Sequence, residues 1–362
     1  MKERESNFEV LRVLAMLLIV TTHFLIWGTT HCAVGPIDVS FTNGWGMNAF
    51  LFPFISSFSS IGVILFILIS SYFVSQSTTL RFDRLFKTWS VTWFYSVVIG
   101  GAAFLMHQCS GKRLLMDLAP LGTDQYWFVT KYIALMCLAP VYSTVVKNIS
   151  KRGMLITLAI LSLLVVNITH GVPYGNTFFS DSPNSVASFS LIFFIAAYIR
   201  KYGEGEFLAK HCGWIFILCI LLQGAGGLII NYTHISSPAI YAGFSGGNNE
   251  LSLVPATCLF IWFKNRKFKE TFFVRALAQM APYTFAVYLI HDNHHIRDFI
   301  WSGVVDPAEY WQSPWWIVLL VVMPVVIFLI CISIDVIRTW LFKISGYDTT
   351  VEKIKEHNLV IE

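Results

Sequence analysis

Three ionisable residues, Glu9, Arg12 and His23, interrupt a long apolar stretch near the start of the chain. An ionisable side chain inside a membrane helix is costly, by roughly 3 kcal/mol at the bilayer centre, so each one requires a reason. Glu9 and Arg12 fall on one face of a helix, and His23, eleven residues after Arg12, returns to nearly that face about 16 Å further along. We therefore predict one polar stripe with an ion pair at its mouth and an imidazole deeper in the membrane.

This stripe could carry out general-base chemistry. Imidazole is the usual general base near neutral pH, and a cation at the mouth suits an anionic ligand whose reactive end reaches His23. The alternative is structural: Arg12 extends to the lipid headgroups, and His23 hydrogen-bonds another helix. Because the three residues share one stripe, we favour a catalytic site of His23, Arg12 and Glu9.

The elements that position these residues are predicted to be transmembrane helices. Charged residues make up only 13% of the chain and 56% is hydrophobic, whereas a soluble domain carries about 25% charged residues. The apolar runs are long and do not alternate, which favours helices over a barrel. We predict an all-α integral membrane protein with ten spans, at about 10–28, 56–75, 88–107, 126–146, 153–170, 186–200, 213–231, 250–264, 278–293 and 315–338.

The distribution of cations supports this count. Every second connection is nearly empty of Lys and Arg, with Lys112, Arg113 and Arg297 as the main exceptions. By the positive-inside rule, this alternation predicts an even number of spans with both termini cytoplasmic. We expect one membrane domain over 1–345 and a short cytoplasmic tail over 346–362; the net charge of +4 then reflects topology and gives no case for nucleic acid. The cations on the predicted cytoplasmic side are Lys2, Arg4, Arg81, Arg84, Lys87, Lys147, Lys151, Arg152, Arg200, Lys201, Lys210, Lys264, Arg266, Lys267, Lys269, Arg275, Arg338, Lys343, Lys353 and Lys355.

Cysteines and a late histidine cluster were the other candidate sites. The seven cysteines contain no CxxC pair, and only Cys32 and Cys109 fall on the outer side, where a disulfide is chemically allowed but is left open. His291, His294 and His295 have a spacing that could bind a metal, but no carboxylate is arranged with them along the sequence. We therefore predict no metal site and expect His291 to be structural or to face an acceptor.

Several motifs together resemble the membrane-bound acyltransferase family 3, which are ten-helix bacterial proteins that O-acylate cell-surface carbohydrates. Arg12 and His23 are similar to the Arg-x10-His signature of that family, and Arg81-Phe-Asp-Arg84 to its Arg-x-x-Arg element. The chain departs from the family pattern in three ways: Ser71 replaces the usual Gly, Gln125 stands where a His is common, and a periplasmic hydrolase-like domain is lacking. The remaining matches, in order, are Gly62-Val63 through Phe66, Ser70-Ser71-Tyr72-Phe73, Gln125-Tyr126-Trp127-Phe128 with Leu135 through Pro140, and Tyr283 through Tyr288-Leu-Ile-His291.

The resemblance implies a donor, an activity and a location. The donor would be an acyl-CoA, usually acetyl-CoA, used as co-substrate from the cytoplasm, with no bound cofactor. Arg81 and Arg84 would bind its phosphates, although they could also serve only to enforce topology. His23 would deprotonate a sugar hydroxyl or take the acyl group itself, and both remain open. The protein would be an O-acetyltransferase in a bacterial cytoplasmic membrane, where it modifies exopolysaccharide or a lipid-linked carbohydrate.

Residues of the outer side were considered as binders of the carbohydrate acceptor. Trp45, Tyr126, Trp127 and His291 are the candidates, because aromatic rings stack on sugars and polar groups bond hydroxyls. Single aromatics at this depth also serve as membrane anchors. Further polar residues in the outer intervals 29–57 and 171–185 are Asp38, Asn43, Asn48, Tyr174, Asn176, Asp181 and Asn184.

Two other functions fit part of this pattern. Buried charges and broken helices also suit a transporter or flippase of a glycan or lipid-linked precursor. Against it, the chain shows no internal repeat and its cationic motifs gather at one mouth. A glycan polymerase would favour a large outer loop with arginines, and the longest outer interval has none. The acceptor, the acyl chain, the attacked hydroxyl and the oligomeric state stay open.

Overall fold

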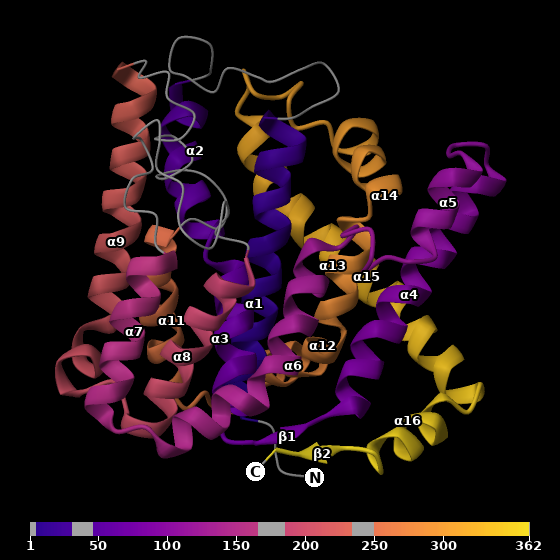
Figure 1. Cartoon of the computed structure of the whole chain (residues 1–362). Helices are drawn as coiled ribbons and strands as arrows, with labels where there is room; N and C mark the ends of the chain where they lie inside the picture. Colours follow the sequence, from indigo (N-terminus) through magenta and orange to yellow (C-terminus); the bar gives the residue numbers. More distant parts are fainter. Residues whose placement is uncertain (1–4, 31–45, 166–184, 234–249, 362) are drawn as a thin grey trace.

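The computed structural model describes residues 5–30, 46–165, 185–233 and 250–361 as a helical bundle (Figure 1). Most of the chain forms long apolar helices, as expected where backbone polar groups can be satisfied only within each helix. The helices are α1 (Ser6–His23), continued by the π-helix η1 (Phe24–Thr30), α2 (Gly46–Ser59), α3 (Gly62–Val74), α4 (Phe82–Leu105), α5 (Gly111–Asp117), α6 (Trp127–Asn148), α7 (Lys151–Val165), α8 (Val186–Tyr202), α9 (Glu206–Thr233), α11 (Leu253–Lys264), α12 (Phe272–Met280), α13 (Thr284–His291), α14 (His294–Asp298), η4 (Phe299–Val304), α15 (Trp315–Ile344) and α16 (Tyr347–Lys355).

A helix lies at each of the ten predicted spans, but not all of them are long. Within the described residues, seven helical segments have the length and apolarity to cross a membrane. Of the others, α7 has 15 residues, α8 has 17 and α11 has 12. The structure therefore establishes an all-helical protein with seven membrane-spanning candidates, and the count of ten with cytoplasmic termini stays a prediction.

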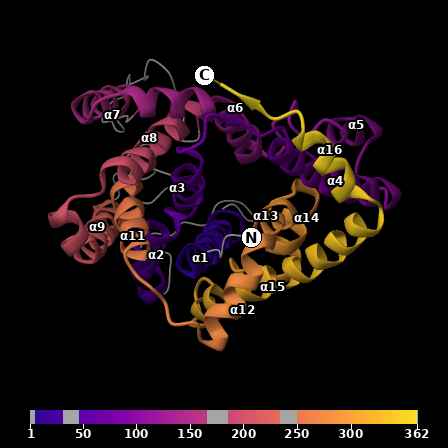
Figure 2. The same ribbon diagram turned by 90° about the horizontal axis from the view of Figure 1, so that it is seen from below.

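Helix α1, which carries the polar stripe, lies in the middle of the bundle. It packs against α2, α3, α11, α12, α13 and α15, and the view along the bundle places it inside a ring of other helices (Figure 2). Gly62 at the start of α3 allows a close approach, because a Cβ there would lie 2.8 Å from the carbonyl oxygen of Ala15. The stripe is thus directed at protein neighbours instead of lipid.

The basic connections gather at one end of the bundle, the lower end in Figure 1. The Lys147 ammonium lies 3.5 Å from the Thr78 hydroxyl, and Lys201 donates to the carbonyl oxygen of Lys147 at 3.1 Å. Lys264 pairs with Glu204 at 3.0 Å. This is the end that the cation pattern predicts to be cytoplasmic.

The predicted tail, 346–362, is described as far as residue 361, and this part folds back on the same end. Strand β2 (Leu359–Val360) pairs antiparallel with β1 (Thr79–Leu80), the strand just before α4. The Tyr347 hydroxyl of α16 lies 2.6 Å from the Ser90 hydroxyl of α4, and Asn358 donates to the Asp83 carboxylate at 2.9 Å. The start of α4 is therefore held by residues from the far end of the chain.

Candidate active site

The site is centred on a pair of histidines from distant parts of the sequence. His23 is the last residue of α1, and His291 is the last residue of α13. The Nδ1 atom of His23 lies 2.8 Å from the Nε2 atom of His291, which is a hydrogen-bonding distance. The side chain of His23 is 13% exposed and His291 is fully buried. The packing of α1 against α13 thus turns two single residues into a coupled pair.

The hydrogen bonds of this pair determine which ring nitrogen carries each proton. Nδ1 of His291 contacts the carbonyl oxygen of Val287, and a carbonyl can only accept, so this nitrogen must carry a proton. Nε2 of the neutral His291 ring is then an acceptor, and Nδ1 of His23 must donate to it. The free lone pair of a neutral His23 is therefore on Nε2, the state that a general base requires.

A buried carboxylate lies next to the pair. Asp292 follows His291 directly, and its Oδ1 atom is 3.7 Å from Nδ1 of His23. Arg297 lies 3.6 Å from the same oxygen, and its guanidinium group sits 3.9 Å above the ring of Trp27. Since opposite charges attract strongly where water is excluded, Asp292 is placed to stabilise His23 when the imidazole gains a proton.

His23 borders a small enclosed cavity of about 30 Å³. Its walls are mainly aromatic and aliphatic, and include Trp127, Phe128 and Tyr288. A volume of this size holds about two water molecules or a two-carbon group. Trp127, one of the predicted acceptor-side residues, therefore lies at the same cavity as His23.

A larger cavity of about 350 Å³ lies on the other side of Phe66, Phe128 and Phe285, three residues that line both spaces. Three cations line it: Arg12 from α1, Lys87 from the first turns of α4, and Arg338 from the end of α15. The stripe predicted along α1 thus begins at a basic cavity and ends at His23, with a layer of phenylalanines between them.

Carboxylates hold two of the three cations in place. The Arg12 guanidinium donates to both oxygens of Glu9 at 2.9 and 2.8 Å, which is the ion pair predicted from sequence. Arg338 forms a two-pronged pair with Asp335, with both contacts at 2.8 Å. The Tyr95 hydroxyl donates to the same carboxylate at 2.7 Å. Such paired arginines keep a fixed geometry and still present nitrogen atoms to an anion.

Arg81 and Arg84 lie beyond this cavity, at the start of α4. Arg81 pairs with Asp83 at 2.9 Å, and its side chain is 35% exposed. Arg84 is exposed and precedes Lys87 by three residues, so these two cations are neighbours on one helical face. The predicted donor residues therefore lie on or beside the first turn of the helix that carries Lys87, but they do not line the basic cavity.

The other acceptor-side candidates have different positions. Tyr126 is fully buried; its hydroxyl donates to the carbonyl oxygen of Leu289 and accepts from Asn293 at 2.6 Å, so it holds the segment that follows His291. Asn48 is also buried and donates to the carbonyl oxygen of Trp311. The remaining outer candidates, together with one of the two outer cysteines, lie outside the described residues: Cys32, Asp38, Asn43, Trp45, Tyr174, Asn176, Asp181 and Asn184.

Sequence reasoning missed the partners of the site. The contact of His23 with His291 spans 268 positions of the chain, and nothing in the local pattern points to it. Asp335 and Arg338 did carry a signal, because a carboxylate and a guanidinium three residues apart within an apolar run require an explanation, as Glu9 and Arg12 did. Lys87 was counted only as a cation that marks topology.

Comparison with known families identifies the family of the chain. The model of the acyltransferase domain of acyltransferase family 3 matches residues 5–334. No curated protein and no solved structure matches the chain. Because this match covers most of the chain, the chain belongs to acyltransferase family 3 and is a multi-pass membrane acyltransferase.

Proposed function

We propose that this protein transfers an acetyl group from cytoplasmic acetyl-CoA to a hydroxyl of a cell-surface or lipid-linked carbohydrate, in a bacterial cytoplasmic membrane. The observation that carries the proposal is the position of His23. The hydrogen bond to His291 leaves the free lone pair of His23 on Nε2. The small cavity that His23 borders shares three phenylalanines with the cavity that Arg12, Lys87 and Arg338 line.

The cations at that cavity support an acyl-CoA donor. A CoA molecule presents several phosphate oxygens at one end and a thioester at the other. Arg81 and Arg84 would meet the phosphates first, while Lys87, Arg338 and Arg12 follow deeper along the same path. Guanidinium groups bind phosphate through paired charge-assisted hydrogen bonds, which gives this end of the site its specificity. The pantetheine arm would then pass between the phenylalanines toward His23.

The reaction follows from the protonation state of His23. Nε2 of His23 removes the proton from the acceptor hydroxyl as its oxygen attacks the thioester carbonyl. The new C–O bond forms, the C–S bond breaks, and the imidazolium returns its proton to the departing CoA thiolate. While His23 is charged, Asp292 at 3.7 Å and the hydrogen bond to His291 stabilise it.

The small cavity favours a short acyl chain. The cavity beside His23 is small, about 30 Å³, which suits an acetyl group better than a long acyl chain. For the carbohydrate acceptor we propose Trp127 as a contact, because an aromatic ring stacks on sugars and Trp127 lies next to His23 at this cavity.

The test compares two substitutions of His23 with a matched control. His23→Ala and His23→Gln should both abolish transfer of radiolabelled acetyl from acetyl-CoA to envelope glycan, at equal abundance in the membrane. Glutamine can hydrogen-bond but cannot take a proton at neutral pH. His211→Gln on α9, where the histidine is half-buried and contacts Phe207 of the same helix, should retain full activity. An active His23→Gln protein would end the catalytic assignment.

A further inference from the structure

A fully buried carboxylate lies apart from the His23 pair, at the C-terminal end of α5. Asp117 is 0% exposed. Its side chain occupies space that Gly100 of α4 leaves open, because a Cβ at Gly100 would lie 2.4 Å from Oδ2 of Asp117. The backbone carbonyl of Asp117 accepts a hydrogen bond from Ser96 at 2.7 Å, which anchors the residue to α4. The carboxylate is thus held rigidly in a place where a charge is costly without a partner.

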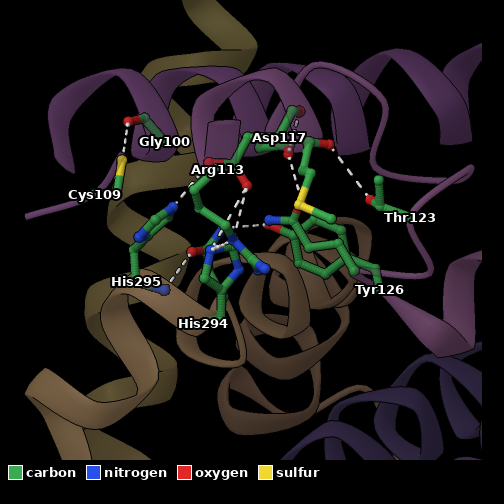
Figure 3. Close-up of polar contacts among 12 residues, drawn as sticks. Gly100, Cys109, Arg113, Asp117, Thr123, Tyr126, His294 and His295 are labelled. Carbon is green, nitrogen blue, oxygen red and sulfur yellow. Dashed lines mark hydrogen bonds and ion pairs between the residues drawn. The ribbon is translucent and has the colours of Figure 1, made fainter. Parts of the chain in front are cut away.

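Two histidines approach this carboxylate from α14, as Figure 3 shows. Nε2 of His295 lies 2.8 Å from Oδ2 of Asp117, and Nε2 of His294 lies 3.6 Å from Oδ1. The side chain of Asn293 accepts from the backbone N–H of His295 and so fixes the start of α14. The sequence pattern around the late histidines contains no carboxylate arranged with them. Asp117, which lies 177 positions before His294, supplies it.

The three side chains have the composition and spacing of a metal site. One ligand atom from each of Asp117, His294 and His295 lies within 4.8 Å of the others. Tetrahedral zinc with bonds of about 2.0–2.1 Å places its ligand atoms about 3.3 Å apart, between the two separations measured above. Two imidazoles and one carboxylate are a common zinc set that leaves a fourth position open. We propose that Asp117, His294 and His295 bind a zinc-type divalent cation.

One ligand atom of the cluster has an unsatisfied lone pair. Among the described residues, Oδ1 of Asp117 is buried and has no hydrogen-bond partner. A cation bound between Asp117 and the histidines would neutralise the carboxylate at short range. In its absence, Arg113 supplies the positive charge: its Nε atom lies 2.7 Å from Nε2 of His294 and 3.9 Å from Oδ1 of Asp117. The guanidinium and the metal therefore compete for the same lone pair, and Arg113, 38% exposed, is free to swing outward.

The bound ion would join elements that carry the active site. Only Asp292 and Asn293 separate His291 from His294. A metal bridge from α5 to α14 would therefore hold the segment that positions His291 and Asp292 beside His23. This role is independent of the donor and acceptor proposed above, because it requires only that the fold be as described.

The test measures zinc binding by the purified full-length protein in detergent. After chelation and removal of the chelator, calorimetry with ZnCl2 should show one site per chain, and zinc should raise the Tm, whereas MgCl2 should do neither because Mg²⁺ prefers oxygen ligands. His295→Gln and His294→Gln should each weaken zinc binding by more than about tenfold, since even outer partners of metal ligands contribute 10–100-fold. His211→Gln should bind zinc like the unaltered protein.

Arg113→Ala provides a variant that does not depend on breaking the site. Because Arg113 competes with the ion, its removal should tighten zinc binding and enlarge the rise in Tm. Asp117→Asn should abolish both. Zinc binding that is absent, or that is unchanged in both histidine variants, would overturn the proposal, and so would weaker binding in Arg113→Ala.

Discussion

Replacement of His291 tests how the histidine pair works, separately from whether His23 is the base. Nε2 of His291 accepts a hydrogen bond from the Nδ1–H of His23 at 2.8 Å. Nδ1–H of His291 in turn donates to the carbonyl oxygen of Val287. His291→Ala removes the hydrogen-bond acceptor that keeps the proton of neutral His23 on Nδ1. In His291→Gln, the amide oxygen reaches nearly the position of Nε2 and can still accept from His23.

The expected magnitude follows from one hydrogen bond in two charge states. With neutral His23, the bond to His291 contributes about 1 kcal/mol; when His23 is an imidazolium in the transition state, the bond is charge-assisted and contributes about 1.5–3 kcal/mol. Only the difference between the two states, about 0.5–2 kcal/mol, changes the barrier, so His291→Ala should lower kcat by about 2- to 30-fold, at about tenfold per 1.4 kcal/mol. Loss of the base itself costs about 10²–10⁴-fold, so His291→Ala should retain more activity than His23→Ala. His291→Gln should retain most of its kcat.

The assay is acetyl-CoA turnover in membranes or proteoliposomes with matched protein abundance, with kcat and KM determined separately. KM for acetyl-CoA should be unchanged in both variants, because His291 does not line the basic cavity. Since His291 is fully buried, the Tm of each variant in detergent serves as the control for folding. Equal losses in the Gln and Ala variants, with both proteins folded, would refute the hydrogen-bond argument, as would a fully active His291→Ala protein.

Two further predictions concern the donor mouth and the packing of the bundle. Replacing both Arg81 and Arg84 with Ala should weaken acyl-CoA binding while leaving the protein folded. Lys at both positions should restore binding only in part, because Lys lacks the planar guanidinium group. Unchanged donor affinity in the double Ala variant would show that these residues do not bind the donor. Gly62→Ala should lower the stability in detergent by about 1–3 kcal/mol, because its Cβ would lie 2.8 Å from the carbonyl oxygen of Ala15. Gly101→Ala, whose Cβ would meet nothing within 4 Å, should be neutral or slightly stabilising; an equal loss in both would contradict the close packing of α1 on α3.

The sequence was sufficient for features that depend on local pattern. Apolar runs located the helices, and helical spacing correctly placed Glu9 beside Arg12. Span length was harder to predict, because breaks at η1 and between α2 and α3 depend on how helices meet inside the bundle. These breaks leave no periodic signal in the sequence.

The partners of the predicted residues could not be found in this way. His291 read as an outer histidine of uncertain role, and only the packing of α13 on α1 reveals that it touches His23. Asp117 lies in a polar interval between two spans, where a carboxylate is unremarkable, until α14 folds over it. Contacts between residues hundreds of positions apart are set by the tertiary arrangement, which a single sequence does not encode in any local pattern.

The pairing of β2 with β1 has a consequence for biosynthesis. Residues 347–360 leave the ribosome after every apolar helix has been made, yet they brace the start of α4, where Asn358 contacts the Asp83 carboxylate that holds Arg81. A chain cut short by a premature stop codon after α15 would still contain every span described above and could pass the insertion machinery. The start of α4, where we propose that the donor binds, would lack this brace, so we expect such a product to be inserted but inactive. Completion of translation thus becomes a checkpoint between insertion and activity.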